Sequence, residues 1–580
     1  HAHSVAGSPF DALGYPQEHM DFAYENGMDA LALTDHGNAN GLAYQVLHAK
    51  AMEKDGKDFK PIFGCEAYFI PSVSNWKKDY EQIKANAKKK SEYVADNSGT
   101  TVENEESKKK IKSILNKRRH LILLAQNQVG LKNIFKMISS SYVGDNFYRY
   151  PRVDYALLKK HNEGVIAASA CLGGIYAGNY WENRDLGADA ILDAMRNTTQ
   201  KMQRIFGDRW YGELQWNSIP EQHELNQYII QMHHEFGVDL ISTADSHYYN
   251  PTVWKDRELY KRLGWLGKGK PDYLSEELPS SVEEIGYELY PKNGEQMWES
   301  YKRYSEKLNI DYDDDLILDS IKRTYDIAHN RIEKFLPDNT VRLPSFVVPE
   351  GSTATQTLAA FCVEGARGLG LASNPEYVER LKNEVNIIDS RGFSKYFLTM
   401  KAISDIAIEK QIVGPGRGSA AGSLVSYVLG ITQVDPIKYG LQFERFLTKS
   451  GTGYPDIDYD VSDPMVLKEM LIDEWGDNTV VPITNWNTLQ LRSLIKDISK
   501  FYGVEFTEVN NVTSKMVYEA TPLAKKAHGI TAGVYAPTFE ELMLYSETLQ
   551  KFLQKYPKIK THVEKLYGQT RSASRHAGGV

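Results

Sequence analysis

The sequence predicts a multidomain α/β protein, and three observations support this fold class. At 580 residues the chain is long enough for several domains, each with its own hydrophobic core. The first third alternates short apolar runs with amphipathic stretches, a pattern typical of parallel strands and helices packed as a layer or barrel. The second half has mainly helical periodicity, interrupted by a glycine-rich turn and then by a short run of alternating acids.

Composition excludes several classes of protein. Hydrophobic residues make up 42% of the chain, charged residues 25% and aromatic residues 11%, as in soluble globular proteins. No run approaches the ~20 apolar residues of a membrane span, so no membrane partner is expected. Three cysteines (Cys65, Cys171 and Cys362) are too few for a disulfide framework, which predicts a reducing compartment. The net charge of −8 neither indicates nor excludes nucleic-acid binding, because binding requires only a local basic surface.

Residues with metal-binding side chains follow the strands expected in the first third, at 29–34, 62–70, 120–125, 164–169 and 239–243. Strand ends in α/β folds converge on one face, where ligand sites are built. Imidazole and carboxylate ligands together suit Zn, Mn or Fe ions. One isolated histidine is more often a satisfied core residue, but the whole set favours a metal site. The set at or just beyond strand ends is His1, His3, His36, Glu66, His120, Cys171, Asp245 and His247.

Two interpretations of the lysine-rich segment 77–119 stay open. It is either a nucleic-acid-binding arm or a solvated insertion. Acidic residues at 103, 105 and 106 interrupt the positive charge, which favours the solvated insertion.

A glycine turn at residues 413–419, Val-Gly-Pro-Gly-Arg-Gly-Ser, follows helices expected at 355–368, 377–389 and 395–410. Ser419 is predicted to cap a helix over 420–429, so backbone N–H groups of the turn can face an anion. Arg417 adds a cation able to bind phosphate in a bidentate manner. The turn also loosely matches a dinucleotide pattern ending at Asp435, but Asp435-Pro436 predicts a turn and leaves this alternative weak.

The acidic ladder, residues 456–460 with the sequence Asp-Ile-Asp-Tyr-Asp, alternates acids with apolar residues and predicts a strand. All three carboxylates then share one face, with neighbours roughly 7 Å apart. Like charges this close destabilise a strand unless cations neutralise them. A solvated edge strand and a two-metal phosphoryl-transfer site both remain open for the ladder taken alone.

The first third resembles the polymerase-and-histidinol-phosphatase (PHP) domain, a distorted barrel with a trinuclear metal centre. The pieces that carry the resemblance are His-Ala-His-Ser at 1–4, Ala-Leu-Thr-Asp-His-Gly-Asn at 32–38, Gly-Cys-Glu at 64–66, Ala-Cys-Leu-Gly-Gly at 170–174 and Asp-Ser-His-Tyr at 245–248. The resemblance implies a metallohydrolase site, in polymerases a 3′–5′ exonuclease, holding Zn²⁺ or Mn²⁺. Its nine implied ligands are the eight residues named above and Asp11, although residues 4–10 depart from the usual pattern.

The second half is similar to bacterial C-family replicative DNA polymerases, the family of the DNA polymerase III alpha subunit. The similarity rests on residues 414–425, 429–432, 435–436, 443–447 and 455–458, on 485–503 for the thumb, and on His-Ala-Gly-Gly at 576–579 for a return to the palm. It implies Mg²⁺ ligands at Asp456 and Asp458, and triphosphate contacts from Gly418, Ser419 and, more weakly, Arg417. Residues 448–454 depart from the family pattern, which favours a phage-type or otherwise atypical member.

The two resemblances together predict a PHP distorted (β/α) barrel followed by a nucleotidyltransferase palm and a helical thumb. The predicted boundaries are 1–258 for the PHP domain, 259–487 for the first part of the palm, 488–565 for the thumb and 566–580 for a return to the palm. Both ends look like cuts through a longer protein, and the family's third catalytic Asp is expected beyond Val580. No exonuclease domain is inserted within the PHP segment.

The resemblance implies a replicative DNA polymerase whose PHP site trims mispaired 3′ ends. In the palm, a primer 3′-oxygen would attack the α-phosphate of a nucleotide beside two Mg²⁺ ions. Expected partners are primer–template DNA and dNTPs, with a sliding clamp and other replisome subunits bound through regions absent here. The expected location is the cytoplasm of a bacterium or of a phage-infected host. A stand-alone PHP phosphoesterase acting on small phosphates and a non-enzymatic replisome scaffold are the alternatives.

Overall fold

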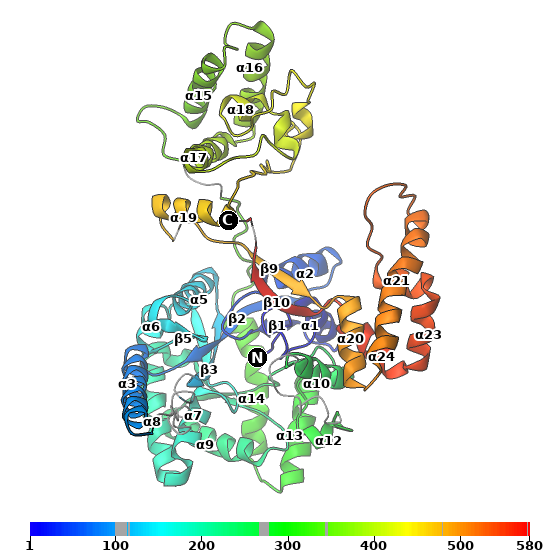
Figure 1. Cartoon of the computed structure of the whole chain (residues 1–580). Helices are drawn as coiled ribbons and strands as arrows, with labels where there is room; N and C mark the ends of the chain where they lie inside the picture. The colour runs from blue at the N-terminus through cyan, green and yellow to red at the C-terminus, as the bar shows by residue number, and fades with distance from the viewer. Residues whose placement is uncertain are drawn as a thin grey trace. The chain divides into compact units, whose positions relative to one another are not determined.

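The computed structural model describes residues 1–98, 113, 116–265, 278–342, 346–477, 479–576 and 578–579, with backbone only for 87–98 (Figure 1). Part of the lysine-rich segment 77–119 therefore lies outside the described residues. The chain divides into two compact units. The first comprises His1–Asp338 with Trp486–Ser572, and the second Asn339–Asn485 with Ala573–Val580.

The first unit contains the metal-ligand candidates and most of the strands. Its strands are β1 (Ala30–Leu33), β2 (Lys60–Phe69), β3 (Arg119–Ala125), β4 (Phe147–Tyr148), β5 (Tyr150–Val153), β6 (Val165–Ala168), β7 (Trp210–Leu214) and β8 (Asp239–Ser242). Its helices up to residue 338 are α1 (Pro16–Glu25), α2 (Leu42–Lys54), α3 (Val73–Ser98), α5 (Gln128–Ser141), α6 (Tyr155–Lys160), α7 (Ile175–Asn183), α8 (Ala188–Phe206), α9 (Pro220–Phe236), α10 (Trp254–Leu263), α12 (Val282–Ile285), α13 (Gly294–Leu308) and α14 (Asp314–Asp326).

These strands form one curled sheet in the order β4-β5-β2-β3-β6-β7-β8, with β1 paired to β2. Most pairs are parallel, as predicted, but β3 runs antiparallel to both β2 and β6, so the prediction of parallel strands is wrong there. The cause is the connection between β2 and β3. Phe69 at the end of β2 pairs with Arg119 at the start of β3, so the chain leaves and re-enters the sheet at the same edge instead of crossing to the other.

Side chains of the sheet alternate between an outer face packed on helices and an inner concave face. In β2, Phe63, Cys65, Ala67 and Phe69 belong to the large core shared with α5, α7, α8 and α9. The intervening Ile62 belongs to a second, inner apolar cluster together with Ile327 and Ala328, which follow α14. The same alternation places Glu66 on the inner face. One half of the inner face is thus apolar, and the half near the strand ends is polar.

A helical bundle completes the first unit. It consists of α20 (Leu491–Phe501), α21 (Phe506–Ala527), α22 (Phe539–Tyr545), α23 (Glu547–Lys555) and α24 (Pro557–Leu566). Its apolar residues share one core with Val5, Leu13 and residues of α10. The buried His562 of α24 places Nδ1 2.7 Å from Oδ1 of Asp256 in α10, and the carboxylate oxygen accepts this hydrogen bond. The predicted thumb segment therefore belongs to the first unit, where it packs on α10 and on the N-terminal segment.

The second unit is mainly helical, with α15 (Ala354–Gly368), α16 (Pro375–Ser390), α17 (Ser394–Lys410), α18 (Leu424–Val428) and α19 (Pro464–Trp475) (Figure 1). Helices α15, α16 and α17 confirm the helices predicted at 355–368, 377–389 and 395–410, with ends that differ by at most two residues. Strands β9 (Thr484–Thr488) and β10 (Thr570–Arg575) pair as a two-stranded sheet where the chain passes between the units.

Two local predictions in the second unit are wrong. Ser419 does not cap a helix over 420–429: residues Ser419–Gly422 form a 3₁₀ turn, and α18 begins at Leu424 with Ser423 as its cap. The break arises because Gly422 packs against the backbone of Gln442, where a Cβ would lie 2.6 Å from the carbonyl oxygen. The acidic ladder is extended, but among the described residues its pairing is limited to an isolated bridge just beyond it, between Val413 and Val461.

The compact units do not divide where the domain boundaries were predicted. Helices α13 and α14 pack with the sheet of the first unit, so residues 278–338 belong to that unit rather than to the second. The assignment of 1–258, 259–487, 488–565 and 566–580 to PHP, palm, thumb and palm return stays a prediction.

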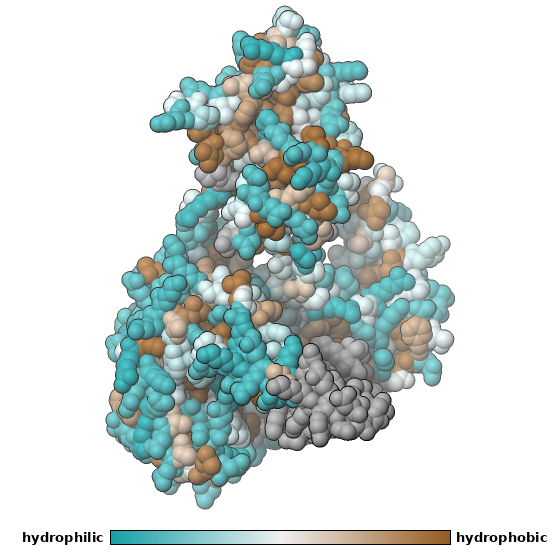
Figure 2. All heavy atoms as spheres, turned by 60° about the vertical axis from the view of Figure 1, so that its left-hand side comes forward, coloured by the Kyte–Doolittle hydropathy of each residue, from teal (hydrophilic) through white to brown (hydrophobic). Residues whose placement is uncertain are grey.

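The surface gives no sign of a membrane span. Among the described residues, no helix combines the length and apolar character needed to cross a bilayer. On the face drawn in Figure 2, hydrophobic residues lie scattered between hydrophilic ones.

Candidate metal centre and candidate nucleotidyl-transfer site

The polar edge of the curled sheet brings together all nine predicted metal ligands. His36 follows β1, Cys171 follows β6, and Asp245 follows β8, so these residues extend from the carboxyl ends of parallel strands. His120 lies instead at the start of β3, which reaches the same edge because that strand is antiparallel. The segment that contains His1 and His3 joins this edge through a bridge between Ala2 and Ser246.

Glu66 lies at the middle of the cluster and is fully buried. Its Oε1 lies 2.8 Å from His120 Nδ1 and 3.5 Å from His1 Nε2. Its Oε2 lies 2.5 Å from His36 Nδ1 and 3.5 Å from His3 Nε2. One carboxylate therefore faces four imidazoles.

Two aspartates complete the cluster. Asp245 Oδ1 lies 3.0 Å from His1 Nε2, 3.2 Å from His3 Nε2 and 3.4 Å from His247 Nδ1. Asp11, the ninth predicted ligand, places Oδ2 2.9 Å from His36 Nε2 and 3.5 Å from His247 Nε2. Both aspartates thus lie where the resemblance expects ligands, and Cys171 Sγ lies 3.6 Å from His120 Nδ1.

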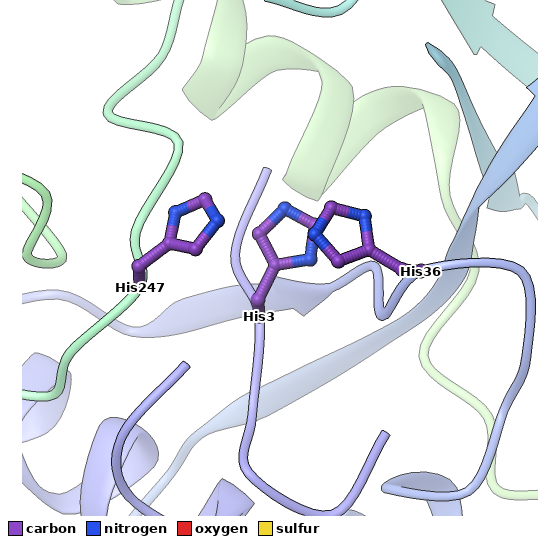
Figure 3. A group of neighbouring side chains, drawn as sticks. All are labelled: His3, His36 and His247. Carbon is purple, nitrogen blue, oxygen red and sulfur yellow. The ribbon is translucent and has the colours of Figure 1, made fainter. Parts of the chain in front are cut away.

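The histidine rings are packed against one another. In Figure 3, His3 lies between His36 and His247, which extend from different segments of the chain. The ring centroid of His3 is 4.1 Å from that of His36 and 4.5 Å from that of His247. Three imidazoles this close would repel one another if all were protonated, which favours a neutral His3 that can present a lone pair to a shared cation.

The donor set fits several divalent metal ions. Three overlapping groups have ligand atoms within 4.8 Å of one another: His3–His36–His247, His1–His3–Glu66 and His36–Glu66–His120. Any two of these groups share one residue, as expected for neighbouring ions with bridging ligands. Both oxygens of Glu66, and Oδ1 of Asp245, are buried and form no hydrogen bond of good geometry although imidazole nitrogens lie close to them; a metal ion would satisfy these oxygens.

Protonation states differ within the cluster. Burial opposes the charge of His1, but Asp245 and Glu213 raise the pKa of its ring well above the usual imidazole value. Burial likewise opposes the charge of His36, but Glu66 and Asp11 raise the pKa of that ring well above the usual value. A metal ion would therefore have to displace a proton from each of these two rings.

Burial, together with the neighbouring His36 and His247, lowers the pKa of His3 to about 3. Burial opposes the charge of Glu66, but His120 and His36 hold the pKa of its carboxyl well below its usual range. A neutral imidazole and an ionised carboxylate are the forms that bind metals. Bound metals would supply Lewis acidity and activate water for phosphoester hydrolysis.

Three residues that support the cluster were missed by the sequence analysis. Glu213, on the inner face of β7, places Oε1 2.5 Å from His1 Nδ1. Asp35 is buried and accepts hydrogen bonds from Ser4 N at 2.6 Å and from two serine hydroxyls, which fixes the loop between His3 and Asp11. Arg257 donates to Asp11 Oδ1 at 3.0 Å and to the Asp11 carbonyl at 2.7 Å.

A local signal existed for Glu213 alone. It is a single acid within a short aromatic and aliphatic run, Trp-Tyr-Gly-Glu-Leu at 210–214, which forms a fully buried strand. A carboxylate in such a strand needs a partner, because an isolated buried charge is costly. Asp35 and Arg257 are recognisable only from the contacts that folding creates.

The second unit brings the glycine turn against the acidic ladder. Gly414 N donates to the Asp460 carbonyl at 2.9 Å. Gly418 has φ +67°, and a Cβ there would lie 2.6 Å from Asp458 Oδ2. Arg417 places Nε 3.9 Å from Asp458 Oδ2 and Nη1 3.4 Å from Asp460 Oδ1. The predicted phosphate turn and the predicted metal-binding acids therefore share one surface.

Exposure along the acidic ladder follows the predicted alternation. Asp456, Asp458 and Asp460 are exposed, while Ile457 is buried and Tyr459 half-buried. The Ile457 N–H donates to the Tyr396 hydroxyl at 3.2 Å. The carboxylates can thus act together on one ligand even though the segment is not part of a sheet. The donor set consists of carboxylate oxygens only, which suits Mg²⁺.

A buried carboxylate supports the turn from behind. Glu384 accepts hydrogen bonds from Leu424 N, Val425 N and the Ser423 hydroxyl, each at 3.0 Å, and so caps the start of α18. Asp435 Oδ1 accepts from two backbone N–H groups at 3.0 and 3.1 Å. This confirms the predicted turn at Asp435 and leaves the dinucleotide alternative without a second strand to place its acid.

Comparison with known proteins agrees with both halves of this description. Residues 1–217 match the family model of the PHP domain, and residues 356–580 match that of the bacterial DNA polymerase III alpha NTPase domain. A DNA polymerase III subunit alpha from Aquifex aeolicus is 30% identical over 597 aligned residues, which cover 96% of this chain and 45% of that protein. The chain belongs to the DNA polymerase III alpha family.

Further relatives in this family carry the same name. The subunit alpha of Borreliella burgdorferi is 28% identical over all of this chain and 44% of its own length, and that of Helicobacter pylori strain 26695 is 29% identical over 84% of this chain and 37% of its own length. This chain thus spans less than half the length of these relatives. The predicted fold class, with a PHP barrel first, is confirmed.

Among solved structures, an amidohydrolase from Chromobacterium violaceum is similar to 45% of this chain and 95% of its own, at 15% identity. The TM-score is 0.21, too low to support a conclusion about the fold.

Proposed function

We propose that this chain holds two separate sites for phosphoester chemistry. The second unit contains the nucleotidyl-transfer site of a replicative DNA polymerase, and the first contains a PHP-type 3′–5′ exonuclease that proofreads. Membership of the DNA polymerase III alpha family supports the first assignment. The observation that carries the second is the convergence of nine metal-binding side chains around the buried Glu66.

In the polymerase site, Asp456 and Asp458 would hold Mg²⁺. Bound Mg²⁺ would neutralise charge on the nucleotide phosphates and at the primer 3′-oxygen. The exposed backbone of Gly418 and the Ser419 hydroxyl would bind the triphosphate. Arg417 pairs weakly with the acids in the structure, so it can exchange a carboxylate for an incoming phosphate.

In the PHP site, the nine clustered residues would hold Zn²⁺ or Mn²⁺. Glu66 and Asp245 would supply the carboxylate ligands at the middle of the cluster, because each of them faces several imidazoles. Glu213 would keep the His1 ring oriented with Nε2 toward the ions. Arg257 would fix the carboxylate of Asp11 at the edge of the cluster.

The partners proposed for the whole polymerase are primer–template DNA and dNTPs, with a sliding clamp and other replisome subunits bound by parts of the protein outside this sequence. A cytoplasmic location, in a bacterium or a phage-infected cell, would follow from this role.

A stand-alone PHP phosphoesterase is the chief alternative, because the nine clustered residues suit either enzyme. It leaves the contact between the glycine turn and the acidic ladder without a function. A replisome scaffold without enzymatic activity would leave both the metal-ligand cluster and the pairing of the glycine turn with the acidic ladder without a function.

Primer extension by the full-length protein tests the polymerase assignment. Asp456→Ala should reduce extension by several orders of magnitude, and extension at the wild-type rate would refute it. Hydrolysis of a single-stranded 3′ end, measured with Mn²⁺ or Zn²⁺ supplied, tests the PHP assignment: His36→Ala should abolish it. If the PHP site binds no metal and His36→Ala changes no hydrolysis, the exonuclease assignment is wrong.

A further inference from the structure

Arg118 is an arginine without a carboxylate partner beside the metal centre. Its guanidinium carbon lies 3.8 Å from the ring centroid of Tyr150 and 5.3 Å from that of Tyr68. Within the described residues Arg118 forms no ion pair. Its Nη1 donates a hydrogen bond to the Asn116 carbonyl at 3.0 Å, and its Nε is buried with no hydrogen-bond acceptor. Both neighbours behave differently, since Lys117 and Arg119 each pair with Glu182, at 3.5 and 2.7 Å.

Tyr68 connects this arginine to the metal ligands. It lies two residues after Glu66 in β2, so both side chains are on the inner face of the sheet. Its ring centroid is 6.1 Å from that of His36, nearly parallel at 11°, and 5.6 Å from that of His120. Tyr150 packs edge-on against Tyr68, with centroids 5.5 Å apart. Arg118, Tyr150 and Tyr68 therefore form a row, here called the arginine–tyrosine row, that ends at the metal centre.

The row continues toward solvent through further aromatic residues. Phe147 and Tyr148 of β4 are 44% and 40% exposed, and Tyr148 pairs with Tyr150 across the hairpin that joins β4 to β5. Phe147 stacks on the exposed Tyr142, with ring centroids 5.6 Å apart at 20°. Strands β5 and β3 flank β2 in the sheet (Figure 1), so Tyr150 at the start of β5 and Arg118 just before β3 lie on either side of Tyr68 in β2.

A purely structural role accounts poorly for the row. A buried N–H without an acceptor destabilises a fold, so a guanidinium with a purely structural role would be expected to pair with a carboxylate as its neighbours do. An arginine held flat by aromatic rings presents its N–H edge in a fixed orientation, as phosphate binding requires. Flat, exposed aromatic rings beside such a cation are the usual platform for unpaired nucleobases.

We propose that the arginine–tyrosine row binds single-stranded nucleic acid, with Arg118 on a backbone phosphate and the aromatic residues under neighbouring bases. The row thereby directs a 3′ end into the metal centre. This inference rests on the proposed hydrolase function of that centre and names its substrate class. It also gives a specific form to the nucleic-acid-binding interpretation of segment 77–119, limited to its last residues.

Kinetics with two substrates test the role of the row. One substrate is a 5′-labelled single-stranded oligonucleotide, and the other is bis(p-nitrophenyl) phosphate, a phosphodiester without bases. Arg118→Ala and Tyr150→Leu should raise KM for the oligonucleotide about tenfold, within the range expected for one lost stacking or phosphate contact, and should change kcat less than about threefold. Hydrolysis of the small diester should change less than about threefold.

Two variants serve as controls. Lys117→Ala removes the same charge one residue away, from a side chain that pairs with Glu182, and should leave KM unchanged. Arg118→Lys retains the charge but not the planar group, and should behave like Arg118→Ala. Metal content of each variant, measured by mass spectrometry, should equal that of the wild type. An unchanged KM in Arg118→Ala, or equal losses on both substrates, would overturn the proposal.

A crosslinking experiment separates this proposal from the hydrolase function itself. An oligonucleotide with 5-iodouracil near its 3′ end, but not at the terminal position, is irradiated with the full-length protein in EDTA, where no hydrolysis occurs. Crosslinks to a peptide within 142–150, reduced at least fivefold by Arg118→Ala, support the row even if the protein hydrolyses no diester. If the protein hydrolyses the oligonucleotide but forms no such crosslinks, the proposed exonuclease function stands and the proposed binding of nucleic acid by the arginine–tyrosine row is wrong.

Discussion

Replacing Glu213 by Gln should weaken metal binding at the PHP site without unfolding the protein. Glu213 Oε1 lies 2.5 Å from His1 Nδ1, and both side chains are buried. Thr243 donates its hydroxyl to the same oxygen, so the carboxylate is fixed from two sides. The substitution keeps the shape of the side chain and removes the charge that holds the imidazole with Nε2 toward Glu66 and Asp245.

Two independent arguments give the same size for this effect. A hydrogen bond to a charged group contributes about 1.5–3 kcal/mol. Loss of a carboxylate that orients a metal-binding histidine typically lowers metal affinity about 10- to 100-fold, or roughly 1.4–2.8 kcal/mol at 1.4 kcal/mol per factor of ten. We therefore expect the Kd for Zn²⁺ or Mn²⁺ to rise by about one to two orders of magnitude.

Competition with a chromophoric chelator measures this affinity, and thermal unfolding in EDTA measures stability apart from the metal. Glu384→Gln is the matched control, because it removes a buried carboxylate from the second unit and touches none of the nine ligands. It should leave metal affinity unchanged. If folded Glu213→Gln binds metal as tightly as the wild type, the orienting role assigned to Glu213 is wrong.

Three further predictions concern both sites. Gly418→Ala should reduce primer extension at least tenfold, because a Cβ would lie 2.6 Å from Asp458 Oδ2. Gly430 is the control, since it has a similar positive φ but no atom within 4 Å of a Cβ. Gly430→Ala should lower the free energy of unfolding, measured in a denaturation curve, by only the ~1 kcal/mol of backbone strain. Zn²⁺ or Mn²⁺ at 100-fold excess over Kd should stabilise the folded wild type by about 3 kcal/mol and so raise its unfolding temperature in calorimetry. Glu66→Gln should abolish that rise. Asp458→Asn should abolish extension in a gel assay, while Asp460→Asn, which removes a partner of Arg417, should reduce it less than about tenfold; equal losses would contradict the assignment.

The clustering of the candidate ligands could be predicted from the sequence because most of them lie at or just beyond strand ends, whereas Glu66 lies within β2. Short apolar runs place the strands, and the positions of His36, Glu66 and Asp245 relative to them determine the edge where they meet. The direction of β3 could not be predicted in this way, since it depends on where the chain re-enters the sheet. Glu213 was missed because its strand, β7, was not recognised.

The glycine turn shows the limit of local signals. Ser419 has the residue type and spacing of a helix cap, but Gly422 packs against Gln442, twenty residues further along the chain, and the helix starts later. The alternation of the acidic ladder predicted correctly which side chains are exposed. It did not predict that the segment lies outside a sheet, because strand pairing depends on a neighbour and not on the segment itself.

One assay on a 5′-labelled primer–template tests the central claim that the chain holds two independent sites. The full-length wild type, Asp456→Ala, His36→Ala and the double variant are each given metal ions, first without and then with dNTPs. The account predicts that Asp456→Ala still shortens the primer but cannot extend it, that His36→Ala extends but cannot shorten it, and that the double variant does neither. Loss of both activities in either single variant, with the protein still folded, would contradict it.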